Sequence, residues 1–579
     1  MNIPLMSYVR ALIFLLLGFV FSTCGGAGGG GAGSPASDQT PPTVVSTRPI
    51  DQEKGIPPFS EIAVTFSEPL DGSTITSQTL TVAGAGGNIP GTIHYNGATA
   101  IFRPLAGLPY ASSYTVTATT GVKDLAGNTL SENHVFTFST PPLPILKQFG
   151  SSEDESAHAV VTDAGGNVYI TGATRGSLPG HVNAGQNDGF IVKFDVSGVQ
   201  EWVRQFGSPQ RDIPEAMAID KNGNIYIAGA TTGALGPNPP NAADTMCDTQ
   251  SVEIDQCKDY FIAKYDSSGV QQWIRQGGTG FIEIGFGAAV DPDGNVYVAG
   301  STGGDLDGNV NALIGNPDPG SLCGRDDIFL VKYNSDGIRQ WTRILGTKCN
   351  DVAYGLAADR SGHLYITGNT FEGLGGNGGG NGFPDPRLFV AKYDALGVRE
   401  WLNLFGPGSS VGFALNITAD SQGNAYAVGY TNGSLDGNKD AFGQSDVFIV
   451  KYDSSGTKAW TRQFGSNTLE GAYGVAVDAN DQVYLTGMTD GPLDGHTQPQ
   501  GTCSHGAIGS CFDFFLAKFS STGAQQWIWE SGSAEEDFAY GLTVDHGNVY
   551  IVGMAEGALE GNSHLGGGDL FLAKYNLSE

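Results

Sequence analysis

The chain has 579 residues, of which 59 are acidic and 29 are basic, and its formal net charge is −30 at pH 7. A chain this negative repels nucleic acid and anionic membrane surfaces, which argues against binding to either by charge attraction. We therefore expect no nucleic-acid partner, and cationic groups or divalent ions are the favoured charged ligands.

Residues 1–24 are predicted to be a lipoprotein-type signal peptide. Arg10 precedes an apolar run over residues 11–21, which is the pattern of a secretory signal. The segment ends in F-S-T-C, and small residues before a cysteine are similar to a bacterial lipobox. We predict that Cys24 is lipidated and anchors the chain to a membrane, with simple cleavage nearby as the alternative. Residues 25–40 are rich in Gly, Ser, Ala and Pro and predict a flexible tether.

Residues 41–139 are predicted to form a separate Ig-like β-sandwich. Six short apolar or alternating segments are separated by Gly, Pro and Asn turns, and the length suits one sandwich. Tyr114, with Leu108 upstream, predicts a tyrosine corner. The phrases T-F-S-E-P at 65–69 and V-K-D-L-A-G-N at 122–128 resemble bacterial Ig-like domains of surface-layer and adhesion proteins, which implies a spacer role. Residues 140–144 predict a short, stiff, Pro-rich linker.

Residues 145–579 repeat one phrase seven times. Each copy reads D-x-x-G-N-x-Y-x-x-G-x-T, a Gly/Asn/Asp-rich loop, D-x-F-[IL]-[VA]-K-[YF]-D-x-x-G, and then a strand led by Trp in six of the copies. The copy predicts four short strands with two Gly-centred hairpin turns, and strands such as 448–452 are apolar almost throughout, as in sheets covered on both faces. Four-stranded sheets stacked around an axis make a β-propeller. The anchor residues are Asp163, Asp220, Asp291, Asp359, Asp420, Asp478 and Asp545, and Lys193, Lys264, Lys332, Lys392, Lys451, Lys518 and Lys574.

The two ends of the repeat region are out of phase by one strand. The seventh copy stops after Tyr575 without a fourth strand, whereas residues 145–150 align with the fourth strand at 202–207. We therefore expect the first strand to complete the last blade, which hides two open sheet edges. The predicted fold class is all-β, a seven-bladed β-propeller preceded by an Ig-like β-sandwich.

The repeat phrases resemble the bacterial SBBP (seven-bladed β-propeller) repeat proteins. The resemblance covers about three quarters of the chain and implies the fold, but it implies no defined reaction. Residues 452–460 also look like the hairpins of quinoprotein-type propellers and of a related outer-membrane assembly lipoprotein, a group that is usually eight-bladed.

Cysteine usage indicates an oxidising compartment. Setting Cys24 aside leaves six cysteines, all in propeller loops, and an even number in an exported protein suggests disulfides. Two pairs lie within single loops, and antiparallel pairing brings the third to one end of a blade. A zinc site is disfavoured because the chain lacks C-x-x-C spacing. The predicted pairs are Cys247 with Cys257, Cys323 with Cys349, and Cys503 with Cys511.

Two loops alternate acidic and amide residues in a way that suits calcium, which is the one candidate cofactor. Neither has the spacing or the closing Glu of an EF-hand, and solvated turns use the same residue types, so both interpretations stay open. The candidate ligands are Asp305, Asp307, Asn309, Asp436, Asn438 and Asp440.

The repeated Asp and Lys are predicted to build blades rather than to catalyse. A catalytic centre needs one asymmetric constellation, whereas these residues recur in every copy; a turn-capping Asp and a Lys whose stem packs while its amine reaches a carboxylate suffice. The six repeated Trp residues are expected in the core between blades, with sugar stacking as the alternative. They are Trp202, Trp273, Trp341, Trp401, Trp460 and Trp527.

No catalytic residue is predicted. The G-x-S-x-G match at 408–412 has no following helix to form a nucleophile elbow, and H-E-x-x-H does not occur. We expect a monomeric, exported, lipid-anchored binding or scaffold protein of the outer membrane, surface-exposed or periplasmic, that contacts protein or glycan. Its working face is predicted on the long loops at 233–259, 303–327, 371–387 and 491–513. A periplasmic envelope-assembly factor and a polysaccharide-acting enzyme are the alternatives.

Overall fold

The computed structural model describes residues 38–56, 60–105, 108–109, 111–140, 145–235, 257–311, 326–371, 374, 387–406, 412–436, 444–493 and 512–576. The predicted signal peptide and most of the tether lie outside these residues, as do Cys24, Cys247, Cys323, Cys503 and Cys511, and Asn438 and Asp440. Within the described part of the chain, no helix has the length and apolar character needed to cross a bilayer.

The N-terminal module is a sandwich of two four-stranded sheets, ordered β1-β2-β6-β5 and β4-β3-β7-β8. Side chains from both inner faces, among them Val64, Phe102 and Phe136, form one buried core. Tyr114 is 2% exposed, and its hydroxyl donates to the Pro109 carbonyl at 3.2 Å, so the predicted tyrosine corner is confirmed. The strands are β1 Val44–Arg48, β2 Ile62–Phe66, β3 Leu80–Gly84, β4 Gly87–Asn88, β5 Gly91–Asn96, β6 Thr99–Pro104, β7 Ser113–Ala118 and β8 His134–Ser139, with the short helix η1 at Gly72–Thr74.

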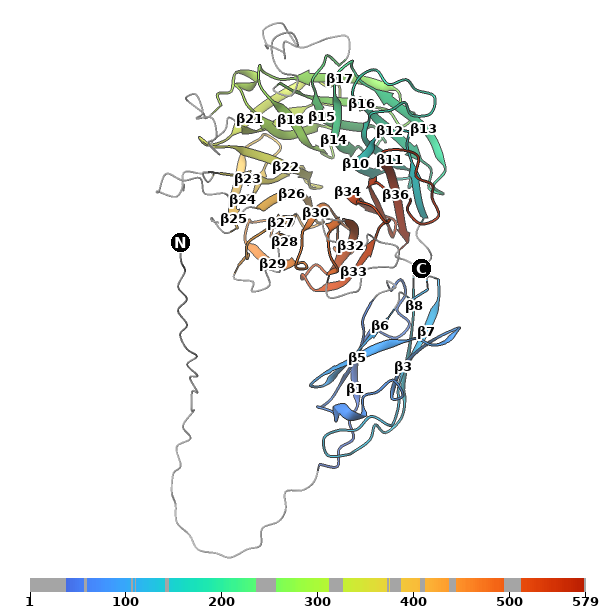
Figure 1. Ribbon diagram of the computed structural model, residues 1–579. Helices are drawn as coiled ribbons and strands as arrows, with labels where there is room; N and C mark the ends of the chain where they lie inside the picture. Colours follow the sequence, from blue (N-terminus) through green and yellow to red (C-terminus); the bar gives the residue numbers. More distant parts are fainter. Residues whose placement is uncertain are drawn as a thin grey trace, which may run out of the picture.

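The remaining described residues form seven four-stranded antiparallel sheets arranged in a ring (Figure 1). The first strands are β10 Glu155–Thr162, β14 Asp212–Ile219, β18 Glu283–Val290, β22 Asp351–Ala358, β26 Gly412–Ala419, β30 Glu470–Val477 and β34 Asp537–Asp545. The second strands are β11 Val168–Thr174, β15 Ile225–Thr231, β19 Val296–Thr302, β23 Leu364–Thr370, β27 Ala425–Thr431, β31 Val483–Thr489 and β35 Asn548–Ala555. The third strands are β12 Asp188–Phe194, β16 Asp259–Tyr265, β20 Asp327–Tyr333, β24 Arg387–Tyr393, β28 Asp446–Tyr452, β32 Asp513–Phe519 and β36 Asp569–Asn576. The fourth strands are β13 Gln200–Phe206, β17 Gln271–Gly277, β21 Arg339–Leu345, β25 Arg399–Phe405, β29 Lys458–Phe464, β33 Gln525–Ser531 and β9 Ile145–Phe149; η2 spans Leu306–Gly308.

The ring closes as the sequence predicts. β9, the first strand of the propeller, pairs with β36, the last, with Phe149 opposite Leu570. The first strands of neighbouring blades contact one another around the axis, and β34 meets β10 to complete the circle. The fold class is confirmed.

The Gly of the Y-x-x-G phrase is explained by a close approach of two strands. Each first strand has a bulge opposite this Gly, for example between Ala157 and Ala159 in the first blade. A Cβ on Gly172 would lie only 1.9 Å from the Ser156 carbonyl oxygen, so a side chain cannot be accommodated there. The second and third strands on either side of this point are almost completely buried between blades.

Candidate functional site

The propeller has two different ends, and the repeated Asp lies at the end that carries the tight turns. In the fifth blade, Asp420 Oδ1 accepts from the backbone N–H groups of Gln422 and Asn424, each at 2.9 Å. Its Oδ2 accepts from Asn424 Nδ2 at 2.7 Å and from the Tyr426 hydroxyl at 3.0 Å. Asp163, Asp220 and Asp291 make the same contacts in their own blades. The turn-capping role predicted for this Asp is confirmed.

The repeated Lys joins neighbouring blades at the same end. Lys451 Nζ lies 4.8 Å from the centre of the Tyr426 ring and 3.7 Å from Asp420 Oδ2, and it donates to the Ser521 carbonyl of the next blade at 3.2 Å. Lys264, Lys332 and Lys392 also donate to a turn carbonyl of the following blade. These lysines therefore hold the ring together, as the structural interpretation predicts.

The six repeated Trp residues lie between blades, but they are half-buried at the turn end rather than enclosed in the core. Trp273 packs on Tyr226 with ring centres 6.0 Å apart, and its Nε1 donates to the Ser335 carbonyl of the next blade at 3.0 Å. A Cβ on Gly337 would lie 2.7 Å from the Trp273 ring, so the Gly of the hairpin turn makes room for the indole. Because the indole faces are occupied in this way, sugar stacking on them is disfavoured.

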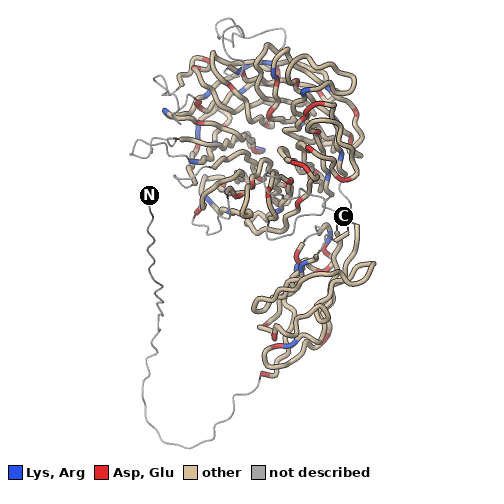
Figure 2. The backbone as a smooth tube through the Cα atoms, in the orientation of Figure 1, with Lys and Arg blue, Asp and Glu red and all other residues tan. Residues whose placement is uncertain are grey.

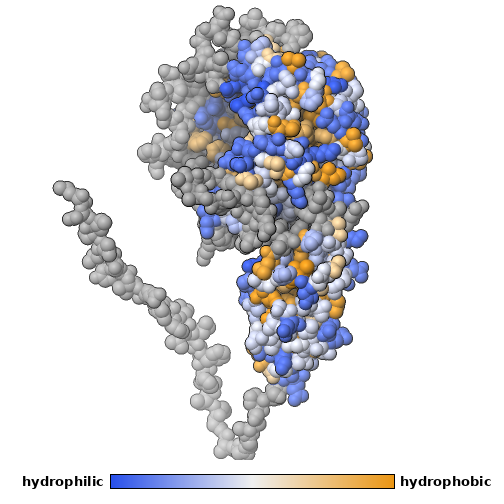
Figure 3. Space-filling view, turned by 45° about the vertical axis from the view of Figure 1, so that its right-hand side comes forward, coloured by the Kyte–Doolittle hydropathy of each residue, from blue (hydrophilic) through white to orange (hydrophobic). Residues whose placement is uncertain are grey.

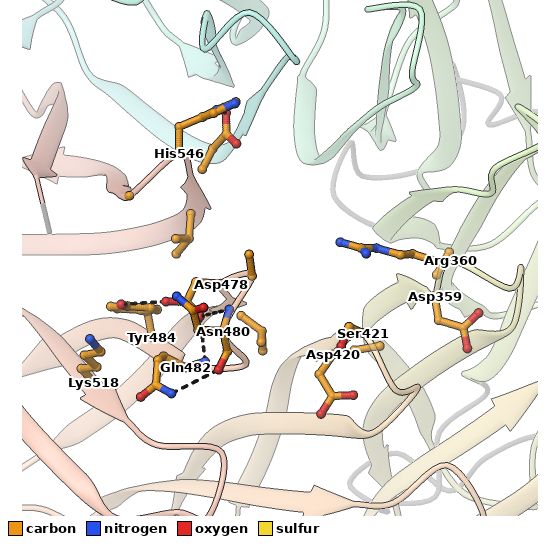
Figure 4. A pocket seen from close by; sticks show the side chains of 17 residues that line it. Asp359, Arg360, Asp420, Ser421, Asp478, Asn480, Gln482, Tyr484, Lys518 and His546 are labelled. Atoms are coloured by element: carbon orange, nitrogen blue, oxygen red, sulfur yellow. Dashed lines mark hydrogen bonds and ion pairs between the residues drawn. The ribbon is translucent and has the colours of Figure 1, made fainter. Parts of the chain in front are cut away.

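A cavity of about 670 Å³ opens at the turn end, between the first turns of the fourth to seventh blades (Figure 4). The residues that follow each capping Asp line it, namely Arg360, Ser421, Ala479 and His546. Figure 4 shows Arg360 pointing into the opening. The His546 ring nitrogen Nδ1 lies 2.7 Å from Asp545 Oδ2. We call this opening the axial pocket.

The electrostatics of the axial pocket favour binding over catalysis. Burial raises the pKa of Asp420, but hydrogen bonds from Asn424, Gln422 and Tyr426 outweigh it, so that pKa lies below its usual value and the group stays ionised. Burial lowers the pKa of Lys518, while Asp478 and Glu53 oppose the change. The carboxylates are fixed as turn caps, so the lining offers an ammonium, a guanidinium and amides that suit a polar ligand.

The opposite end of the ring, from which the long loops leave, contains a feature that was missed from the sequence: buried carboxyl groups from neighbouring blades face each other. Six first strands and six third strands begin with an acid, and each of these acids is at most 2% exposed. A Cβ on Gly207 would lie 2.4 Å from Asp188 Oδ1 and 3.1 Å from Asp212 Oδ2, so both carboxyl groups meet at this Gly. The acids are Glu155, Asp212, Glu283, Asp351, Glu470 and Asp537 on first strands, and Asp188, Asp259, Asp327, Asp446, Asp513 and Asp569 on third strands.

Four of the six acid pairs contain a buried oxygen without a hydrogen-bond partner. Asp212 accepts from the Ser208 backbone N–H at 2.5 Å and from the Thr231 hydroxyl at 2.5 Å. Asp188 Oδ2 accepts from Gln205 Nε2 at 2.9 Å, but its Oδ1, which faces the neighbouring blade, has no hydrogen-bond partner. The sequence does carry a signal for these pairs, because G-[ST]-x-x-x-[DE] recurs before the first strands and an Asp opens the D-x-F phrase.

Burial raises the pKa of several of these acids into the neutral range. The pKa of Asp351 rises to about 7, and so does the pKa of Asp537, in both cases chiefly because burial penalises the charged form. For Asp513, burial and the neighbouring Asp537 together raise the pKa to about 7. This end of the ring thus contains acids that titrate near physiological pH.

The predicted calcium ligands have partners within the chain. Asp307 forms an ion pair with Arg339 and accepts from the Thr342 hydroxyl at 2.5 Å. Asp305 accepts from the backbone N–H of Asn311 at 2.8 Å, and Asn309 Nδ2 donates to the Leu306 carbonyl at 3.2 Å. These contacts fold the loop back onto β21, so calcium binding here would require Asp307 to give up Arg339.

Asp436, the described member of the second predicted calcium loop, is held in the same way. It lies 2.5 Å from Lys458 Nζ and accepts from the Thr461 hydroxyl at 2.6 Å. Elsewhere, in the Ig-like module, ligand oxygens of Asp38, Glu68 and Asp124 lie within 4.8 Å of one another. Asp124 already accepts from the Asn128 backbone and side chain, so the spacing alone does not define a metal site.

Two of the predicted disulfide cysteines lie in described residues. Cys257 and Cys349 are both disulfide-bonded. The partners expected for them, Cys247 and Cys323, lie outside the described residues, so the pairing stays a prediction, as does the bridge between Cys503 and Cys511.

Architecture and repeats together define a β-propeller protein with an N-terminal Ig-like module. Residues 38–140 match the family model of the bacterial Ig-like domain. Residues 201–237, 272–307, 340–373 and 400–436 match that of the SBBP β-propeller repeat. The chain therefore carries a bacterial Ig-like domain followed by SBBP repeats, as the resemblance implies.

Two curated relatives match over much of the chain. An uncharacterized WD repeat-containing protein of Acanthamoeba polyphaga mimivirus is 24% identical over 431 residues, which are 61% of this chain and 31% of that protein. The regulatory protein FlaEY of Caulobacter vibrioides is 25% identical over 465 residues, 75% of this chain and 47% of that protein. The chain thus spans less than half the length of both relatives.

Solved propellers are more distant. The WD40 domain of Neurospora crassa Pan2 aligns with 73% of this chain and 91% of that domain, at 9% identity and a TM-score of 0.34. A similarity this low has no bearing on function.

Proposed function

We propose that the chain is a non-enzymatic binding scaffold of the cell envelope and that the loop end of its propeller contacts a protein or glycan partner. The proposal rests on one observation: the segments that connect successive strands have uniform lengths at one end of the propeller and unequal lengths at the other. At the turn end they are uniform, since residues 162–168 and 358–364 span the same length in two different blades. At the other end they are unequal, because the connection over residues 231–259 is about twice as long as that over 174–188. Recognition commonly resides in variable loops held by a rigid scaffold.

The chemistry of the surface supports a polar partner. Acidic and basic positions are spread around the ring rather than gathered into one basic face (Figure 2). Figure 3 shows polar residues interspersed with single apolar ones on the face in view, and not a broad apolar area. With a net charge of −30, such a surface suits hydroxyl-rich or cationic partners and disfavours nucleic acid.

The Ig-like module and the tether predicted before it serve in this proposal as spacers. A lipid on Cys24 would place the propeller at the outer membrane, with the spacers holding it away from the bilayer. Surface exposure and adhesion or matrix binding form the leading version, and a periplasmic position is the alternative.

Protease treatment of intact cells tests the location. We expect the propeller to be lost from blots of treated cells while a cytoplasmic protein persists. Full protection of the propeller would contradict surface adhesion and move the binding role to the periplasm, where envelope assembly becomes the better interpretation.

Loop exchange tests the binding face. Residues 232–258 are replaced by residues 175–187 of the first blade, which join equivalent strands, and binding of the full-length chain to matrix protein and glycan fractions is measured. We expect at least a tenfold loss of binding with an unchanged thermal unfolding midpoint. The double variant Arg360→Ala, Lys518→Ala at the axial pocket is the matched control and should bind normally. Hydrolysis of a polysaccharide that this double variant abolishes would overturn the non-enzymatic proposal.

A further inference from the structure

The first strand of every blade has a bulge at its fourth residue, and the seven bulged residues surround the axis of the ring. A bulged residue has no direct partner on the second strand, so its side chain is re-aimed. The first strands are the innermost strands of the ring (Figure 1), yet all seven bulged residues are partly exposed, so they line an opening along the axis. We call them the bulge ring: His158, Glu215, Phe286, Tyr354, Leu415, Tyr473 and Tyr540.

Members of the bulge ring from neighbouring blades contact one another. The ring centres of Tyr473 and Tyr540 are 5.7 Å apart, and those of Tyr540 and His158 are 5.9 Å apart. His158 Nδ1 lies 3.6 Å from Glu215 Oε2 of the second blade. The other members are apolar or aromatic. The bulge ring therefore has one ionisable side, made by the first two blades, and an otherwise apolar or aromatic wall.

Both ring nitrogens of His158 already have partners. Nδ1 lies 2.6 Å from the Pro214 carbonyl oxygen, which can only accept, so Nδ1 bears a hydrogen and donates it there. Nε2 lies 2.8 Å from the Ser156 hydroxyl, which donates to it when the imidazole is neutral. His158 thus has no hydrogen left to donate to Glu215.

Glu215 accepts no hydrogen bond from any residue in the described part of the chain, and its one ion-pair neighbour there is His158. Its side chain is 30% exposed, yet burial raises its pKa, and the charges of His158 and Lys258 oppose this change without cancelling it. Partial exposure combined with this cost of burial describes a carboxyl group on a narrow opening inside the protein. A cation that enters the opening would stabilise the charged form of this group.

The residues of the bulge ring suit an organic cation better than a metal ion. A metal ion needs several ligand atoms, whereas the ring offers one carboxylate, and the nitrogens of His158 are occupied. For a protonated amine, the carboxylate supplies the counter-charge and the Tyr faces attract the ammonium group. The apolar members can contact the body of the ligand. The net charge of −30 also favours a cation.

We propose that the bulge ring binds a small organic cation, a protonated amine with an apolar body. Glu215 is the counter-charge, and Tyr473 and Tyr540 form the aromatic wall beside it. This site lies inside the propeller, and the proposal does not rest on the partner proposed for the loop end.

Calorimetric titration of the full-length chain with benzylamine, and with benzyl alcohol as its neutral counterpart, tests the proposal. We expect one benzylamine site per chain and binding of the alcohol that is weaker by about tenfold or more. Glu215→Gln keeps the size of the side chain and removes its charge, so it should fold and lose about tenfold or more in affinity for benzylamine. Glu132→Gln changes an exposed acid of the Ig-like module, so it is the control for net charge and should bind like the wild type. Tyr540→Leu should weaken binding several-fold.

Three outcomes would overturn the proposal. Equal affinity for benzylamine and benzyl alcohol would show that the carboxylate has no role. Unchanged benzylamine binding in Glu215→Gln would place the amine elsewhere, for example among the acids of the axial pocket. Failure of benzylamine to bind the wild type would exclude the amine site itself. If Glu215→Gln does not fold, the preference of the wild type for the amine and the loss in Tyr540→Leu still decide.

Discussion

The two ends of the propeller use the same residue type in opposite ways. At the turn end, the carboxylate of Asp420 accepts four hydrogen bonds and has Lys451 close by. At the loop end, Asp351 accepts from Thr347, but burial outweighs these hydrogen bonds and, with the nearby charge of Asp327, raises its pKa to about 7. Burial alone therefore does not decide the charge state of an Asp; the supply of donors around it does.

One interface lacks the acid pair and shows what the ring can do without it. Arg387 opens the third strand of the fourth blade and Gly412 opens the first strand of the fifth, at the positions that acids occupy elsewhere. Arg387 donates to the Gly406 carbonyl at 3.1 Å. Since the blades still pack in the usual way there, the acid pairs are not needed to form the ring, and removing their charge should not prevent folding.

A change of pH is the strongest test of the difference between the acids at the two ends of the propeller. Asp351, Asp513 and Asp537 have folded pKa values of about 7, above the ordinary value of 3.8. Folding then takes up protons, so the stabilisation is complete below about pH 4 and is lost as the pH rises through 7. Between pH 8 and pH 5 the free energy of unfolding should increase by on the order of 5 kcal/mol, counting the coupled Asp513 and Asp537 as one group.

Urea unfolding followed by tryptophan fluorescence, in chelator at pH 8 and pH 5, measures this change for the propeller alone. The turn-end caps do not oppose it, because the pKa values of Asp163 and Asp420 lie below their usual value and these groups stay ionised throughout that range. A propeller that becomes less stable on acidification from pH 8 to pH 5 would show that the acids are ionised in the folded state.

The contrast between the two ends also explains which features could be predicted from the sequence. The blades, the closure by β9 and the caps could be predicted because turn residues, Gly and apolar strands act locally and recur in every copy. The acid pairs could not be predicted, because each pair joins residues of two different blades, such as Asp188 and Asp212. The segment between these residues looks like an exposed turn in the sequence, so burial of the acids is not expected.

Removing a cap should have the next largest effect. Asp420→Ala leaves the N–H groups of Gln422 and Asn424 and the hydroxyl of Tyr426 without their acceptor, and Lys451 without its counter-charge. We expect a loss of about 3 kcal/mol in the free energy of unfolding, read from urea midpoints. Asp195→Ala, a matched cap on an exposed hairpin turn, should cost much less, since water replaces the lost bonds. Equal losses would contradict the role given to burial.

The smallest predicted effect is a stabilisation, opposite in sign to the loss expected for Asp420→Ala. Asp351→Asn keeps the shape of the side chain and its acceptor for Thr347, and it supplies an NH₂ group that can donate to the neighbouring Asp327. At pH 8 the change removes a buried charge, so the free energy of unfolding should rise by about 1–2 kcal/mol. At pH 5, where Asp351 is already protonated because its pKa is about 7, the gain should vanish. Asp420→Asn should instead destabilise the chain at both pH values, because its carboxylate accepts four hydrogen bonds and faces Lys451. If both amide substitutions shift the urea midpoint in the same direction at pH 8, the two ends of the propeller do not differ in the way their hydrogen bonds imply.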